Sequence, residues 1–114
     1  MAKFVVEFQY HVDREQRQTV HPAHADYLHS LAGRGVLLLA GPLVRENGGL
    51  LIYEVENREE LQRVLDSEPY VKAGFVAESR IRQWQPGKGS WITMLVSPRD
   101  TTVPDRYLLR SASK

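Results

Sequence analysis

Two short segments, far apart in the sequence, carry side chains that could transfer protons. His24 lies in the segment 21–28, which opens an amphipathic helix. Glu68 lies in the segment 67–74, near the expected end of a second helix and directly before Pro69. An imidazole and a carboxylate in one pocket are the smallest set of groups that can move protons without a cofactor. Whether these two groups meet depends on the elements that position them.

The first half of the chain is typical of one strand followed by one helix. Side chains alternate from residue 4 to 10 with the period of a strand. Asp13 and Gln16 have the spacing of a capping box, so a helix is expected to begin there. Pro22 would then kink that helix, and the helical pattern improves from Ala23 onward.

The second half of the chain alternates between strands, a turn and one helix. The run 36–40 is wholly apolar, which is typical of a strand covered on both faces. The residues at 46–49 tolerate positive φ and indicate a hairpin turn. The remaining expected elements are a strand at 50–55, a helix that begins with a capping box at Asn57 and Glu60, and a strand at 75–84. The order predicts an α+β protein with the ferredoxin-like βαββαβ plan.

A break at Pro86-Gly87-Lys88-Gly89 divides the chain. Residues 1–86 form the expected ferredoxin-like domain, and residues 87–114 form a C-terminal extension. The extension is expected to hold one extra strand at 90–96 and a tail, which could lie on a neighbouring subunit.

The two expected helices would cover one face of the sheet and leave the other face bare. The strands at 36–40 and 50–53 are apolar on both faces, and unshielded apolar patches of that size are uncommon on monomers. A second copy packed across the open face, as a symmetric homodimer, is therefore expected. The rival explanation is that the extra strand or the tail folds back over its own sheet.

Composition excludes several classes of protein. The net charge of +1 and the pI of about 8.1 argue against a nucleic-acid binder. Cysteine is absent, which excludes disulfides, thiolate catalysis and cysteine metal sites. Glu7 interrupts any signal-peptide apolar region, and the apolar stretch 36–44 is too short to span a bilayer. A cytoplasmic protein without a membrane or nucleic-acid partner is expected.

The expected topology brings the candidate groups to one end of the molecule. In this plan the first strand ends where the first helix begins, and the second strand and the second helix end at the same edge. His24 lies near that helix start, Gly41 and Pro42 near that strand end, and Glu68 near that helix end. These residues, with Tyr27 and Tyr70 nearby in sequence, are the expected walls of a pocket.

Three motifs carry a resemblance to a known family, namely Pro22-Ala23-His24, the segment 38–43, and the segment from Glu68 to Gly74. In order and spacing they resemble the YCII-related family of dimeric α/β barrels, which includes a chlorohydroxyhydroquinone dehydrochlorinase. The resemblance implies a His–Asp dyad. His24 matches the histidine, whereas Glu68 stands where the aspartate would be.

Simpler interpretations exist for the same residues. His24 could be a polar residue at a helix start, Glu68 a solvated one at a helix end, and Tyr70 an amphipathic cover for the core. His21 and His24, three apart, could suggest a metal, but zinc needs a third ligand that the sequence does not offer. Arg80 and Arg82 could hold an anion or form a surface charge ladder with Glu78.

The leading hypothesis is a cofactor-independent enzyme of the lyase, isomerase or dehydrochlorinase type, acting on a small cyclic or aromatic metabolite. His24 would move the proton and Glu68 would orient it, while Tyr27, Gly41, Pro42 and Tyr70 would contact the substrate. No fingerprint of a cofactor is visible in the sequence. The alternative is a dimeric binding or accessory protein that uses the same pocket without proton transfer. A third interpretation is a structural subunit whose tail docks on a larger enzyme.

Overall fold

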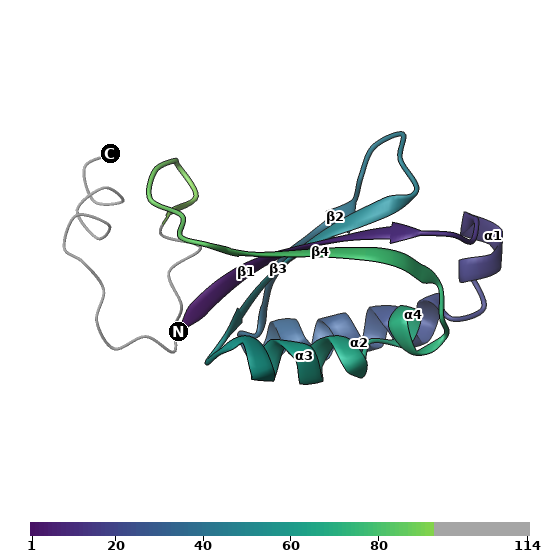
Figure 1. Cartoon of the computed structure of the whole chain (residues 1–114), viewed down its shortest axis with the longest axis horizontal. Coiled ribbons are helices and arrows are strands. Elements are labelled where there is room, and N and C mark those ends of the chain that lie inside the picture. Colours follow the sequence, from purple (N-terminus) through teal and green to yellow (C-terminus); the bar gives the residue numbers. More distant parts are fainter. Residues whose placement is uncertain (93–114) are drawn as a thin grey trace.

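The computed structural model of the chain describes residues 1–92 (Figure 1). The elements follow in the order β1 (Ala2–Tyr10), α1 (Arg14–Arg17), α2 (His21–Gly33), β2 (Leu37–Pro42), β3 (Gly48–Val55), α3 (Arg58–Asp66), α4 (Pro69–Lys72) and β4 (Val76–Trp84). This is the expected order of strands and main helices, to which the short helices α1 and α4 are added.

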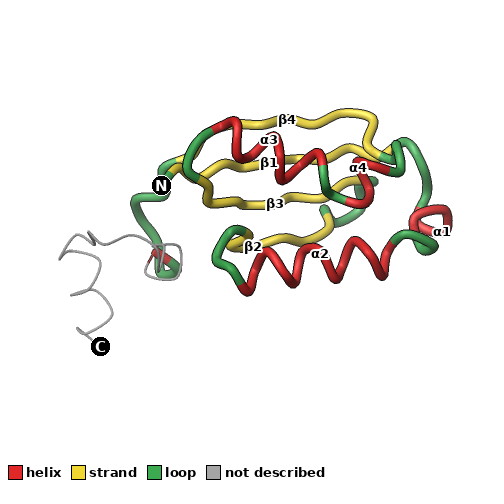
Figure 2. The backbone as a smooth tube through the Cα atoms, turned by 90° about the horizontal axis from the view of Figure 1, so that it is seen from below, coloured by secondary structure: helices red, strands yellow, loops and turns green. Residues whose placement is uncertain are grey.

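The four strands form one antiparallel sheet in the order β2-β3-β1-β4. Strand β3 pairs antiparallel with both β1 and β2, so β1 and β2 run parallel to each other. Helices α2, α3 and α4 lie on one face of the sheet, with α2 beside β2 and α3 beside β3 (Figures 1 and 2). The predicted ferredoxin-like α+β fold is confirmed.

The core lies between the sheet and these helices. On β1 the alternation predicted from sequence places Phe4, Val6 and Phe8 toward the helices, and all three are buried. From the helix side they meet apolar residues such as Leu31 of α2 and Leu61 of α3. This packing fixes the angle at which α2 crosses the sheet, and therefore the position of its first turn.

The segment before α2 differs from the expectation. Asp13 caps α1 and forms a capping box with Gln16, as predicted. However, α1 ends at Arg17, and α2 is a separate helix with Pro22 in its first turn. The prediction of a kink at Pro22 is wrong, because proline costs nothing in a first helical turn, where its missing N–H would have no partner.

The second helical region is also divided in two. Asn57 caps α3 by accepting a hydrogen bond from the Glu60 N–H at 2.9 Å, whereas the Glu60 side chain accepts from the Glu56 N–H at 2.7 Å. Helix α3 ends at Asp66, and Glu68 then caps α4. Glu68 therefore begins a helix rather than closing one. Proline at position 69 disfavours a helical conformation of the residue before it.

Among residues 1–92 of the single chain, β2 is an edge strand with its open face bare, and Leu39 on that face is 37% exposed. One expectation about a strand needs correction. The expected extra strand at 90–96 begins as a turn at Ser90 and Trp91, with Ile92 helical, and residues 93–96 lie outside the described part. None of the helices described has the length and apolar composition of a membrane span.

Gly48 shows how closely the hairpin between β2 and β3 approaches β1. A Cβ atom at Gly48 would lie 2.4 Å from the backbone carbonyl oxygen of Phe8. The neighbouring Asn47 carbonyl accepts a hydrogen bond from the Tyr10 N–H at 2.9 Å. Only glycine permits this approach, which holds the hairpin against the end of β1.

Substitution of Gly48 by alanine is expected to lower the free energy of unfolding by about 2 kcal/mol, because the new methyl group overlaps a backbone oxygen that cannot move aside. Urea denaturation measures the change. Gly33→Ala is the matched control, since a Cβ there meets nothing within 4 Å, and its stability should be unchanged or slightly higher. Equal stability of the two variants would contradict the close approach.

The tyrosines between sheet and helices make the fold sensitive to alkali. Burial first, and then the charge of Glu68, raises the pKa of Tyr10 from 10.0 to about 12. The same two causes, in the same order, raise the pKa of Tyr53, which is fully buried in the core. A raised folded-state pKa means that the unfolded chain loses these protons first.

The free energy of unfolding should therefore hold up to about pH 10 and then fall as the pH rises toward 12. Urea denaturation across this range measures the fall, and tyrosinate absorbance follows ionisation. Tyr10→Phe removes one of the ionising groups and should make the decline shallower. A decline that begins well below pH 10 and is unchanged in Tyr10→Phe would show that other groups control it.

Candidate active site

The structure places His24 and Glu68 side by side. His24 lies in the first turn of α2, and Glu68 lies between α3 and α4. The imidazole Nδ1 and the carboxylate Oε1 share a short hydrogen bond across 44 residues of sequence. Topology thus brings together the two groups that the sequence analysis paired.

Glu68 is completely buried and uses both carboxylate oxygens. Oε1 accepts from His24, while Oε2 accepts from the backbone N–H groups of Tyr70 and Val71 at 3.0 and 3.2 Å. These N–H groups belong to the first turn of α4 and have no partner within that helix. The carboxylate is thereby held in one orientation, with its second oxygen directed at the imidazole.

Two tyrosines hold the His24 ring. Tyr70 stacks on it face to face, with ring centroids 3.9 Å apart and planes inclined by 7°. Tyr10 packs edge-on against Tyr70 at 5.5 Å and 83°. Burial raises the pKa of Tyr70, although the nearby Arg17 guanidinium opposes the shift, so both tyrosines stay neutral near neutral pH.

The hydrogen bond to Glu68 fixes the role of each imidazole nitrogen. An ionised carboxylate can only accept, so Nδ1 of His24 carries the hydrogen in this bond. In the neutral imidazole the lone pair is then on Nε2. A histidine arranged in this way can take a proton at Nε2 while its partner stabilises the resulting positive charge.

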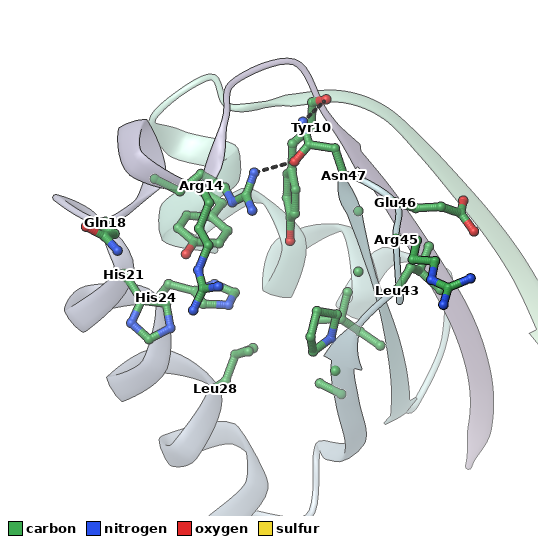
Figure 3. A pocket seen from close by; sticks show the side chains of 18 of the residues that line it. Tyr10, Arg14, Gln18, His21, His24, Leu28, Leu43, Arg45, Glu46 and Asn47 are labelled. Carbon is green, nitrogen blue, oxygen red and sulfur yellow. Dashed lines mark hydrogen bonds between the residues drawn. The ribbon is translucent and has the colours of Figure 1, made fainter.

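His24 lies in the wall of an open cavity of about 950 Å³ between α1, α2, β2 and the hairpin (Figure 3). Of the other residues expected here, Gly41, Pro42 and Tyr70 line this cavity. Tyr27 does not line it. Its hydroxyl donates instead to the Val64 carbonyl at 2.6 Å, which ties α2 to α3.

Several lining residues were not anticipated from the sequence. The most prominent are Tyr10, at the end of β1, and Arg14 and Arg17 of α1. The Arg17 guanidinium lies over the Tyr10 ring, 4.4 Å from its centroid, and Nη1 donates to the Asn47 side-chain oxygen at 2.5 Å. The capping box already indicated a helix turn before α2, and the end of β1 was expected at this edge. Those two signals together could have identified these residues.

Other candidates stay apart from this arrangement or do not extend it. The rings of His21 and His24 lie 5.9 Å apart, and residues 1–92 hold no group of three side chains suited to a metal ion. Arg82 lies 3.6 Å from the Glu7 carboxylate on the open side of the sheet. Neither Arg80 nor Arg82 lines the cavity.

Solved structures with the same fold include two enzymes. A 5-chloro-2-hydroxyhydroquinone dehydrochlorinase from Burkholderia phenoliruptrix, in complex with 2,5-dihydroxybenzoquinone, matches with a TM-score of 0.67 and 23% identity, over 75% of this chain and 95% of that one. An antibiotic biosynthesis monooxygenase matches with a TM-score of 0.53 and 11% identity, over 77% of this chain and all of that one. At these identities the likeness shows the fold alone.

Sequence comparison gives the family. The protein YciI of Escherichia coli O6:H1 is 40% identical over 81 residues, covering 62% of this chain and 83% of that protein, and YciI of Shigella flexneri matches equally well. Residues 2–85 match the YCII-related domain, which is most of the described chain. The resemblance noted in the sequence is confirmed: this chain belongs to the YCII-related family.

Proposed function

We propose that this protein is a cofactor-independent enzyme that moves a proton on a small cyclic or aromatic metabolite. His24 is the proposed general base or acid at Nε2, and Glu68 is its proposed orienting partner. The observation that carries the proposal is the buried hydrogen bond between these side chains at the wall of a cavity. The proposed enzyme belongs to the lyase or isomerase class.

Burial of Glu68 supports the proposal more strongly than proximity does. If Glu68 were a solvated surface residue, its carboxylate would be exposed to water. Instead the carboxylate is completely buried and accepts three hydrogen bonds. A carboxylate fixed in this way holds the imidazole ring in one orientation, with Nδ1 bound and Nε2 not engaged by it. Gly41, Pro42 and Tyr70 are the proposed substrate contacts, because they line the same cavity.

The structural likeness to a dehydrochlorinase supports one reaction in particular. In a dehydrochlorination a base takes a proton from the substrate and chloride leaves with the electrons of its bond to carbon. Nε2 of His24 would receive that proton and then release it to water. The compound in that enzyme's name, 5-chloro-2-hydroxyhydroquinone, is therefore the first substrate to assay.

His24→Ala is expected to lower kcat at least about a hundredfold, because it removes the group that accepts the proton. Chloride release or the appearance of quinone measures the rate. Glu68→Gln keeps an acceptor for the amides of α4 but loses the negative charge, so kcat should fall by about tenfold or more while stability changes little.

His29→Ala is the matched control for this series, since His29 is an exposed histidine of the same helix that does not line the cavity. Turnover should be lost in His24→Ala and kept in His29→Ala. Undiminished turnover in His24→Ala would remove the proposed role. Binding of 2,5-dihydroxybenzoquinone without turnover of any assayed compound would favour the non-catalytic alternative.

We also propose a homodimer formed across the open face of the sheet. Val5 lies opposite the helix-facing side chains of β1, and the strand register aligns it with Ile52, which in turn aligns with Leu39. This apolar row crosses three strands, and its end at Leu39 is 37% exposed. This apolar row on the open face can pack against the same row of a second copy in a symmetric contact.

Leu39→Asp is expected to shift the protein from dimer to monomer at micromolar concentration, because it places a charge within the apolar row of the proposed contact. Sedimentation velocity measures the shift. Val44→Asp is the control: Val44 is 83% exposed, but it belongs to the hairpin loop rather than to the open face. A wild-type chain that sediments as a monomer, or a Leu39→Asp variant that stays dimeric, would refute this interface.

A further inference from the structure

The cavity beside His24 has an excess of positive charge that proton transfer does not require. Arg14, Arg17 and Arg45 line it, against one carboxylate, that of Glu46. Within residues 1–92 no ion pair joins any of these three arginines to a carboxylate. Arginines that face a cavity without an acidic partner are suited to an anionic ligand.

Arg17 is the best fixed of the three. Its Nη1 donates to the Val12 carbonyl at 2.9 Å and to the Asn47 side chain at 2.5 Å, while its plane lies against Tyr10. Both hydrogens of Nη1 are used in these bonds. Nη2 and Nε carry three further N–H groups, and the guanidinium also makes a hydrogen bond with the Tyr70 side chain. The remaining donors form a fork that matches the two oxygens of a carboxylate.

Arg14 reaches the same space from the other end of α1. Figure 3 shows its side chain extending from α1 toward His21 and His24. Its guanidinium is exposed and makes no side-chain hydrogen bond with any residue described. Together the two arginines place a positive region beside His24, on the side where β1 ends.

The neighbouring phenols fit the same ligand. Burial keeps the pKa of Tyr10 at about 12 and also raises that of Tyr70, so both hydroxyls remain protonated donors beside Arg17. The first turn of α2 adds no acidic residue to this side of the cavity. Glu68, the nearest buried carboxylate, is already hydrogen-bonded to His24 and to α4.

We propose that the substrate carries a carboxylate or an equally planar oxyanion, bound by Arg17 and Arg14, which places the reacting atom against Nε2 of His24. This deepens the proposed function and rests on it for the position of the reacting atom. The ligand is thus a small ring with a negative group at one end and a labile proton at the other. A fixed charge at one end orients the molecule, and orientation is what acid–base catalysis needs from binding.

The test compares matched pairs of ligands on the full-length protein. The probes are 2,5-dihydroxybenzoate and benzoate, each with its uncharged amide, and affinity is followed by NMR shifts of backbone amides. At least one carboxylate should bind about tenfold more tightly than its amide and perturb residues of α1 and the hairpin. Arg14→Gln and Arg17→Gln should each cut the carboxylate affinity about fivefold and leave that of the amide unchanged.

Arg63→Gln is the control variant, because Arg63 is exposed on α3 and does not line the cavity. It should bind every probe as the wild type does. Equal affinity for acids and amides, an equal loss of both in the arginine variants, or no binding of any carboxylate would overturn the inference. Tighter binding of inorganic phosphate than of every carboxylate would overturn the planar assignment.

His24→Ala separates this inference from the proposed function. The variant should keep its preference for carboxylates over amides while turnover is lost. If turnover survives in His24→Ala but the preference depends on Arg14 and Arg17, the proton-transfer role fails and the anion site stands. If turnover is lost but the preference is absent, the anion site fails and the catalytic role stands.

Discussion

The buried carboxylate of Glu68 is the constraint on which the site depends. Moving an ionised carboxylate out of water costs several kcal/mol unless its oxygens find partners. Here those partners are two N–H groups of α4 and the imidazole of His24. Each of them requires a particular backbone arrangement. Helix α3 must stop at Asp66 and a new helix must start at Pro69, so that free N–H groups point at the carboxylate.

The same carboxylate explains why His24 is well placed. One nitrogen of the ring is bound to Glu68, one face is covered by Tyr70, and the residue lies in the wall of the cavity. The core supports this position, because Leu31 of α2 packs in one cluster with Phe8 of β1. The packing of α2 against the sheet therefore also determines where His24 lies in the site.

Much of the fold could be predicted because its signals are local. Alternation on β1, the turn residues of the hairpin and the caps at Asp13 and Asn57 each depend on a few neighbouring residues. The expectation for Pro22 was wrong because proline has opposite meanings within a helix and in its first turn. The bond from Tyr27 to Val64 could not be predicted, because the direction of that side chain depends on the rotation of α2, which packing decides.

The order of the elements, the family and the placement of His24 and Glu68 at one end of the sheet could all be inferred from the amino-acid sequence. The burial of Glu68, the stacking of Tyr70 on the imidazole and the position of Arg17 in the cavity wall became visible only in the folded chain. The two groups of features differ in the sequence distance over which the interactions act. Periodicity and capping act over a few residues, whereas burial and side-chain direction arise when segments more than forty residues apart exclude water from each other.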